Sequence, residues 1–472
     1  MSYLTSVNTL LQLKKELEER LRKYESVLGA VRRLPHDVLA CIFEFAVDGD
    51  ESEIPLSQYD ALGSLDTRRA PWVLGQVCHS WRATVTSLPL LWTIFNLSGR
   101  TDTPDIRSLI HLLRFKMDRC QNTPIHVVCR ELTPNLTPHS FVELCTKSSL
   151  WQDAHLEISS WAARHLKAHS GGLFYNLKEL HLHAYSGDDS SLDHDVFQNA
   201  PNLRAVSIRG QNEFIESLVL PWKQLTRYAG LDSASLFITT PFHLKVLPEL
   251  EKVEVCWLDC VNDDGTVETP LDLQGRIKLS FLRTLVLSMA SGAREDSGIG
   301  ELLDHITLPA LRDLEFRVGV EDPAALIRFL ERSACSLQRL SILDMVDTDV
   351  DDAVGVLSSG ISSLHSVDTL VLGSKYTVTN ANLVLDCLTV HPNRSIPLPA
   401  LQCFHTNMYH PMKQMLDMIT SRGHGSDRKV VPLGRLMLDD SPPSSDKDIL
   451  HICIQEAGIE GLFSLEWKEL PG

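Results

Sequence analysis

Residues 311–316 read Leu-Arg-Asp-Leu-Glu-Phe, with apolar residues at the first, fourth and sixth positions. Side chains of a β-strand alternate between its two faces, so this spacing predicts a short strand with one buried face. The same Leu-x-x-Leu-x-Leu pattern, with conservative replacements, recurs at intervals of 22 to 34 residues. Further copies begin at Leu177, Leu203, Leu250, Leu282, Leu337, Val367, Leu433 and Leu462, with weaker copies at Leu225 and Leu401.

These intervals centre on the leucine-rich-repeat period, in which each copy supplies a strand and the residues between copies return as a helix or turn. Residues 323–330 and 446–457 have the apolar spacing of such returning helices, the second closed by Gly458. The sequence therefore predicts an α/β fold, an irregular leucine-rich-repeat solenoid (horseshoe) over residues 96–472. Weaker strand patterns at its start begin at Trp92, Ile125 and Trp151.

In each copy the third, fifth and seventh residues alternate with the buried ones, so we expect them on the concave strand face of the solenoid. Taken together, these positions in three copies carry charges of both signs, which favour a specific polar or charged protein partner over an apolar ligand. The alternative is that they only keep the repeats soluble. The candidate substrate-binding residues are Arg209, Lys252, Glu254, Asp313, Glu315 and Arg317.

The first thirty residues carry a heptad pattern. Leu10, Leu17, Tyr24 and Val31 recur every seven residues among many charged side chains. This pattern predicts an amphipathic helix over residues 1–30. The helix either packs on its own protein or forms a short coiled coil.

Residues 34–92 form a different, helical unit. Pro35 marks a helix start, and apolar residues follow it at helical spacing through Ala46. A second apolar helix is expected from about Trp72 to before Pro89. The stretch 48–70 between them is polar and reads as a loop.

The order Leu34-Pro35-x2-Val38-x3-Ile42-Phe43, then Val77-Cys78-x2-Trp81-Arg82, then Pro89-x-Leu91-Trp92 resembles the F-box motif. The whole layout is similar to the F-box proteins abundant in basidiomycete fungi, apart from the insertion at 48–70. The resemblance implies an all-helical F-box module over residues 31–95 that docks on a Skp-family adaptor. It places at or near the adaptor Leu34, Pro35, Val38, Leu39, Ile42, Phe43, Val77, Cys78, Trp81 and Arg82.

Through that adaptor, the resemblance implies membership of a cullin-RING (SCF-type) ubiquitin ligase. The chain would be the subunit that recognises an unknown protein substrate for ubiquitin-dependent degradation, without catalysis of its own. One alternative is an F-box scaffold that binds the adaptor outside a ligase. Another is an enzyme whose site is assembled from loops.

Charge and composition limit the classes of partner that the chain can bind. The chain of 472 residues has a net charge of −17, and residues 1–130 hold 16 basic against 15 acidic residues. The remainder therefore holds 28 against 46, and such an acidic surface disfavours nucleic acid. No apolar run is long enough to span a membrane, and eleven scattered cysteines favour reduced thiols in the cytosol or nucleus.

Catalytic, metal and cofactor sites are not expected. His181 and His183 share one strand face but have no further ligands at a defined spacing. The run Asp347-x-Asp349-x-Asp351 lacks the glycine and glutamate of a calcium-binding loop and is interpreted as a solvated loop. Asp296-Ser297-Gly298 is interpreted as a plain turn.

Overall fold

A computed structural model of the whole chain gives the fold. The residues it describes are 12–15, 17–18, 20, 34–52, 63–98, 106–130, 138–184, 195–210, 218–231, 238–261, 277–289, 298–320, 322–375, 378–391, 395–408, 412–423, 430–438 and 464–467.

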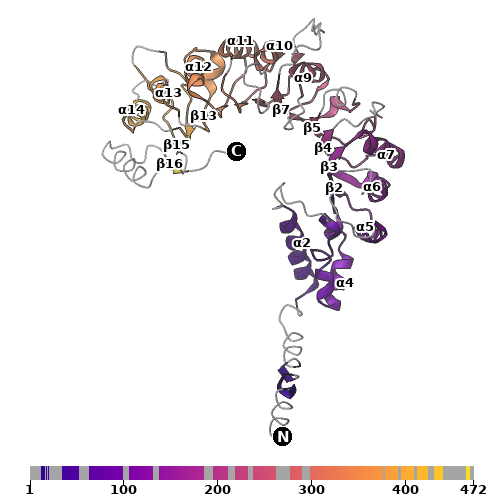
Figure 1. Cartoon of the computed structure of the whole chain (residues 1–472). Coiled ribbons are helices and arrows are strands. Elements are labelled where there is room, and N and C mark those ends of the chain that lie inside the picture. Colours follow the sequence, from indigo (N-terminus) through magenta and orange to yellow (C-terminus); the bar gives the residue numbers. More distant parts are fainter. Residues whose placement is uncertain are drawn as a thin grey trace. The chain divides into compact units, whose positions relative to one another are not determined.

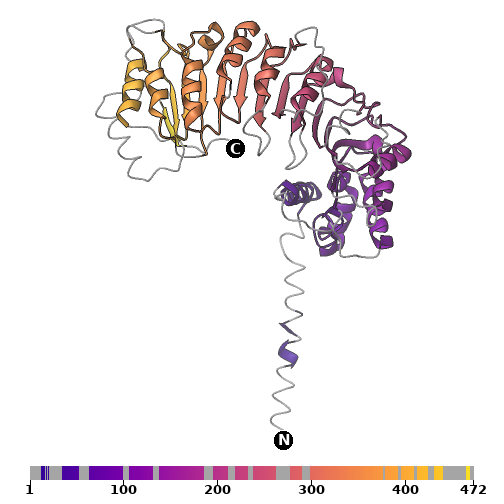
Figure 2. The same ribbon diagram turned by 45° about the horizontal axis from the view of Figure 1, so that its top comes forward.

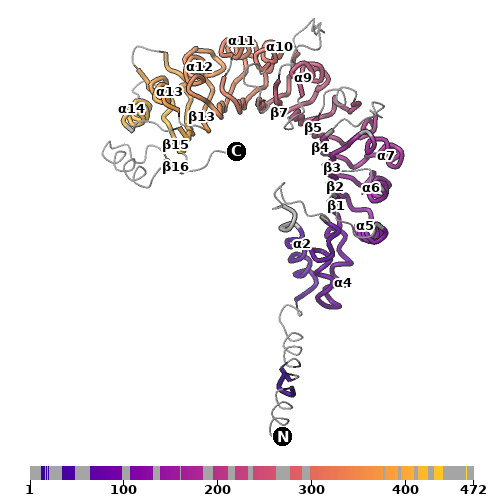
Figure 3. The backbone as a smooth tube through the Cα atoms, in the orientation of Figure 1, coloured from indigo at the N-terminus to yellow at the C-terminus, as the bar shows by residue number. Residues whose placement is uncertain are grey.

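The chain divides into two compact units. The first comprises Met1–Leu156 and Ala168–Gly171, and the second comprises Glu157–Lys167 and Gly172–Gly472. Both contain helices and parallel strands, so the fold is mixed α/β with a mostly parallel sheet. The backbone of each unit can be followed in Figure 3.

The first unit begins with short helices and continues into strand–helix alternation (Figure 1). Its strands pair in parallel in the order β1-β2-β3, as the weaker strand patterns predict. Its elements are α2 (His36–Ser52), η2 (Gly63–Leu65), α3 (Leu74–Val77), α4 (His79–Ser87), η3 (Pro89–Trp92), β1 (Ile94–Ser98), α5 (Ile106–Cys120), β2 (Ile125–Arg130), α6 (Pro138–Cys145), η4 (Ser148–Leu150) and β3 (Trp151–Ile158).

Helix α2 begins directly after Pro35, as the sequence predicts. It continues to Ser52, so the first five residues of the predicted loop 48–70 are helical. At the other end of that stretch, η2 carries Ser64, whose hydroxyl accepts a hydrogen bond from the Asn96 backbone N–H at 2.9 Å. A polar composition therefore did not make these residues a simple loop, because their polar groups find partners within the fold.

The predicted single helix from Trp72 is two helices. The helix is interrupted at Cys78, whose backbone is extended at φ −160° and ψ 173°. Its sulfur accepts a hydrogen bond from the Trp81 backbone N–H at 3.5 Å and so caps the start of α4. A side chain that satisfies a free N–H at a helix start offsets the lost helical bonds at such a break.

The second unit repeats a strand followed by a helix or turn. Its elements are α7 (Ser160–Ser170, whose last three residues belong to the first unit), β4 (Glu179–Ala184), β5 (Ala205–Gly210), η5 (Trp222–Gln224), β6 (Arg227–Leu231), α9 (Thr240–Val246), η6 (Leu247–Glu249), β7 (Val255–Cys260), β8 (Ile277–Lys278), β9 (Thr284–Met289), α10 (Ile299–His305), β10 (Ile306–Thr307), β11 (Asp313–Phe316), α11 (Pro323–Ser333), β12 (Arg339–Ile342), α12 (Asp347–Leu357), η7 (Ser362–Ser366), β13 (Thr369–Leu372), α13 (Asn382–Leu388), β14 (Cys403–Thr406), α14 (Met412–Gly423), β15 (Arg435–Leu438) and β16 (Ser464–Trp467).

Strands β4 to β7, β9 and β11 to β16 pair in parallel, each beside the next along the chain, while β8 pairs with β10 in a separate ladder. Helices α9 to α13 lie along one face of this sheet (Figure 2). The predicted pattern of buried residues is confirmed in the copy at residues 311–316, where Leu311, Leu314 and Phe316 are buried. Buried residues also occupy the equivalent places around Leu285 and Leu340, the register partners of Leu314.

The register of one copy was predicted wrongly. Strand β7 begins at Val255, and Cys256 and Leu258 pair with Leu285 and Leu287. The motif of this copy therefore starts at Val253, three residues after the predicted Leu250. Both residues are buried, because Leu250 ends the preceding turn η6 and also contributes to the core.

The returning helix over residues 323–330 is confirmed as α11. Asp322 accepts a hydrogen bond from the Ala325 backbone N–H at 2.9 Å, and Pro323 occupies the first turn. Both features stabilise a helix start. The second predicted helix, 446–457, and the turn Asp296-Ser297 lie outside the described residues.

The N-terminal segment is described at only a few positions. Residues 12–15, 17–18 and 20 are helical, in keeping with the predicted helix. Leu13 and Leu17 are 50% and 58% exposed. The remaining heptad positions lie outside the described residues.

A buried histidine joins α9 to the sheet. The His243 side chain is fully buried, and its Nε2 donates to the Asp259 carbonyl oxygen at 3.0 Å, since a carbonyl can only accept. Its Nδ1 lies 3.5 Å from the Tyr228 hydroxyl. Gly230 permits this packing, because a Cβ there would lie 2.3 Å from the ring carbon Cε1. Burial lowers the pKa of His243 from 6.5 to about 4.

We expect this histidine to make folding sensitive to acid. Below pH 6.5 the unfolded chain takes up a proton that the folded chain resists, so stability falls until about pH 4. The cost reaches about 2 to 3 kcal/mol by pH 4.5. Urea unfolding at pH 7 and 4.5 should show a smaller loss for His243→Gln than for the unaltered chain. Equal losses in the two proteins would contradict the assignment.

Candidate interaction surfaces

Helix α2 carries two apolar stripes. Val38, Ile42 and Phe45 follow one another at intervals of four and three residues and are 40%, 45% and 81% exposed. Together with the exposed Cys41 they form what we term the α2 stripe. A helix usually buries its apolar face, so an exposed second stripe marks a surface that a partner can cover.

The other stripe of α2 is buried. Leu39 and Phe43 are 2% and 0% exposed, and the Phe43 ring packs edge-on against Trp81 with centroids 4.9 Å apart. The prediction that Leu39 and Phe43 contact a partner is wrong, because they fill the interior between α2 and α4. Trp81 is half-buried, and its buried Nε1 has no hydrogen-bond partner among the described residues.

The remaining predicted adaptor residues are partly accessible. Pro35 is exposed and Leu34 is half-buried, just before α2. Val77 is 47% exposed at the end of α3. Cys78 is half-buried as the cap of α4, and the Arg82 Nε donates to the Gly75 carbonyl at 2.8 Å. Arg82 therefore ties α4 to α3 and keeps an exposed position.

Phe45 and Cys41 were missed by the motif comparison. Phe45 lies seven residues after Val38, one of the matched positions, and Cys41 lies three residues after it. Helical periodicity applied beyond the motif would have found both. Phe45 extends the accessible apolar surface of α2 by about one turn beyond Ile42, and Cys41 lies within that surface.

The strand face is the second candidate surface. It consists of the side chains of the second unit's sheet that alternate with the buried ones. Arg209 lies on it as an exposed residue of β5, paired in register with His183 and Leu231. Asp313 lies on β11 and accepts a hydrogen bond from the Thr284 hydroxyl at 3.2 Å.

Glu315 and Arg317 form one cluster with an aromatic residue. The Arg317 Nε donates to Glu315 at 2.9 Å, and its guanidinium lies 4.3 Å from the centre of the Trp257 ring. A cation over an indole face is stabilising, and the ion pair fixes the position of the guanidinium. Trp257 was missed because the register at Leu250 was wrong.

Lys252 and Glu254 are not on the strand face. Both precede β7 and are exposed, and Glu254 lies 3.9 Å from Arg283 in an ion pair. Because the motif starts at Val253, the face positions of this strand belong to Val255, Trp257 and Asp259. The prediction for Lys252 and Glu254 is therefore wrong in position.

No metal centre is found in the described part of the chain, where no three His, Cys, Asp or Glu residues come together. His183 instead lies 3.9 Å from Glu157. The acidic run is not a loop but the start of α12. There Asp349 accepts a hydrogen bond from the Val346 backbone N–H at 2.8 Å, and Asp347 accepts one from the Thr379 backbone N–H at 2.6 Å. Carboxylates at a helix N-terminus are stabilised by the helix dipole.

The Glu315–Arg317 pair permits a test of the strand face. Glu315→Arg with Arg317→Glu can re-form the ion pair, so we expect unfolding stability to change by less than about 1 kcal/mol. Capture of a client protein should weaken, because the charge pattern is reversed. The matched control, Glu254→Arg with Arg283→Glu, reverses an exposed pair off the face. For both variants, thermal unfolding would measure stability and proximity labelling would measure client capture. An unchanged set of labelled proteins for the Glu315/Arg317 variant would contradict client binding at this pair.

Comparisons with known proteins supply no family for the chain. No protein-family model matches it, and no curated protein matches it either. Among the described residues, no helix is both long and apolar enough to cross a membrane. The two surfaces and the motif resemblance are therefore the observations that bear on function.

Proposed function

We propose that this chain is the substrate-recognition subunit of an SCF-type ubiquitin ligase. The observation that carries the proposal is the α2 stripe. Val38 and Ile42 are exposed at positions where the F-box resemblance expects adaptor contacts, and Phe45 extends the same surface. An exposed apolar stripe of this kind is suited to burial by a Skp-family adaptor.

The proposed architecture is an F-box module followed by an irregular leucine-rich-repeat solenoid. The helical elements α2 to α4 and their packing through Phe43 and Trp81 support the first part. The consecutive parallel strands with buried residues at the repeat positions support the second. Under this proposal the strand face carries the client.

The proposed mechanism is proximity rather than covalent chemistry by this chain. One unit holds the adaptor and the other holds the client, so that the ligase's ubiquitin-charged partner meets the client at a high effective concentration. No cofactor is required for this role. The proposed setting is the cytosol, the nucleus or both, where SCF ligases act.

Co-expression tests the adaptor half of the proposal. Because the α2 stripe exposes apolar side chains, the chain should be poorly recovered alone and better recovered with a Skp-family adaptor. The two proteins should then co-elute in one complex. Equal recovery with and without the adaptor, and separate elution, would contradict the proposal.

A further inference from the structure

Strand β1 is the first strand of the first unit's sheet. It pairs with β2 on one side, and no strand among the described residues pairs with its other side. The free edge of a strand presents backbone N–H and C=O groups that can pair with another chain. Such an edge therefore needs protection, either from its own side chains or from a segment that covers it.

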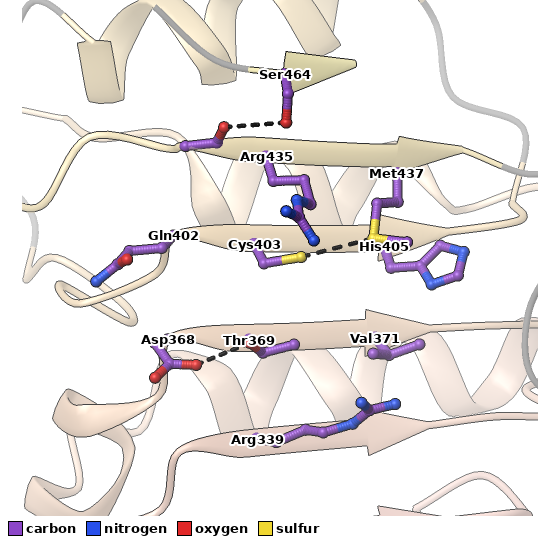
Figure 4. Close-up of a pocket in the computed structure, with 11 residues that line it drawn as sticks. Arg339, Asp368, Thr369, Val371, Gln402, Cys403, His405, Arg435, Met437 and Ser464 are labelled. Atoms are coloured by element: carbon purple, nitrogen blue, oxygen red, sulfur yellow. Dashed lines mark hydrogen bonds between the residues drawn. The ribbon is translucent and has the colours of Figure 1, made fainter. Parts of the chain in front are cut away.

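The sequence of β1 provides no protection of its own. Charged residues and proline are the usual means by which an edge strand avoids pairing. Other strands of the chain do carry charges, for example Arg339 on β12 and Arg435 on β15, which line a groove on the strand face (Figure 4). By contrast, residues 83–99 contain no charged residue and residues 90–99 contain no proline. This composition, with its apolar and aromatic residues, is typical of aggregation-prone strands.

The free edge of β1 is instead covered by η2. The Asn96 backbone N–H donates to the Ser64 hydroxyl at 2.9 Å, and that hydroxyl donates to the Asn96 carbonyl oxygen at 3.4 Å. One side chain thus satisfies two backbone groups that a neighbouring strand would otherwise pair. Ser64, Leu65 and Asp66 are all buried, so this segment packs closely against the fold.

Two donors hold η2 in place. Trp72 Nε1 and Lys116 Nζ both donate to the Ser64 carbonyl oxygen, at 3.1 Å and 3.3 Å. Lys116 is a buried residue of α5, and its ammonium lies 5.1 Å from the centre of the Phe95 ring on β1. A hydrogen bond from a charged donor is stronger than one from a neutral donor, particularly where water is excluded. These contacts therefore fix η2 against the edge of β1.

We propose that η2 is an edge cap, which keeps the free edge of β1 from pairing with the same edge of a second copy of this chain. Two identical edges can pair about a twofold axis, so a second copy always offers a matching partner. The cap lies within residues 48–70, the stretch in which the chain departs from the F-box motif. It acts whether or not the chain binds an adaptor, so it is independent of the proposed function.

Hydrogen exchange of the full-length chain tests the cap. Ser64→Ala removes both hydrogen bonds to Asn96, so exchange in residues 94–98 should accelerate at least about tenfold. Ser148→Ala is the matched control, because the buried Ser148 hydroxyl donates to the Ser170 carbonyl at 3.3 Å, outside η2 and β1. This control should leave exchange in residues 94–98 unchanged. Equal exchange there in Ser64→Ala and the unaltered chain would overturn the cap.

The partner is tested by varying protein concentration. Replacing Ser64, Leu65 and Asp66 together by glycine removes the side chains of the cap. Exchange in residues 94–98 of this variant should be fast in dilute solution and slower in concentrated solution, because a second copy then covers the same amides. The unaltered chain should show no such dependence. Ser64→Ala is measured over the same concentrations, so that the test holds even if the glycine variant does not fold.

Two results would overturn pairing with a second copy. One is fast exchange in residues 94–98 of Ser64→Ala at every concentration. The other is a concentration-dependent slowing confined to α2, which would indicate association through the α2 stripe instead.

Discussion

Replacing Ile42 and Phe45 by aspartate should abolish binding of the Skp-family adaptor, with a loss of affinity of at least about 100-fold. Both side chains are exposed, so the substitution places charges on the surface and leaves the interior stripe of α2 intact. Central aromatic and aliphatic contacts of an interface each contribute about 2 kcal/mol or more, and a buried unpaired carboxylate adds a further penalty. Titration calorimetry with the purified adaptor would measure the loss.

Phe281→Asp is the matched control for this experiment, because Phe281 is a 58% exposed phenylalanine of the second unit. Its affinity for the adaptor should equal that of the unaltered chain. If the Ile42/Phe45 variant binds the adaptor within about threefold of the unaltered chain, the α2 stripe is not the docking surface.

Leu314→Ala should destabilise the second unit by about 2 to 5 kcal/mol. Leu314 is fully buried on β11, between Leu285 of β9 and Leu340 of β12. Repeats bury their apolar faces against their neighbours, so hydrogen exchange should also accelerate in β9 and β12. Urea unfolding measures the loss of stability.

Leu383→Ala provides the comparison for this substitution, because Leu383 is 36% exposed on α13. It should cost less than about 1 kcal/mol. A loss below about 0.5 kcal/mol for Leu314→Ala would mean that β11 contributes little to the core.

The repeat spacing predicted most of the second unit, because alternation of buried residues is a local property of each strand. It failed at Leu250 because another apolar residue, Val253, lies three positions later and fits the same pattern. Only the pairing of β7 with β9 distinguishes the two registers. The error removed Trp257 from the candidate residues and put Lys252 and Glu254 in its place.

The candidate surfaces were less predictable than the fold. The motif comparison found Val38 and Ile42, yet it could not separate them from Leu39 and Phe43, since apolar residues on both faces of α2 look alike in sequence. Burial separates them only once α4 packs against one face.

The central claim is tested most directly by purifying the tagged chain from its own cells and quantifying the proteins that accompany it. We predict that a Skp-family adaptor and a cullin co-purify in equal amounts, and that both are lost together from the Ile42→Asp/Phe45→Asp variant. The adaptor without the cullin would indicate a scaffold outside the ligase. Either that result or the absence of both proteins would contradict the account.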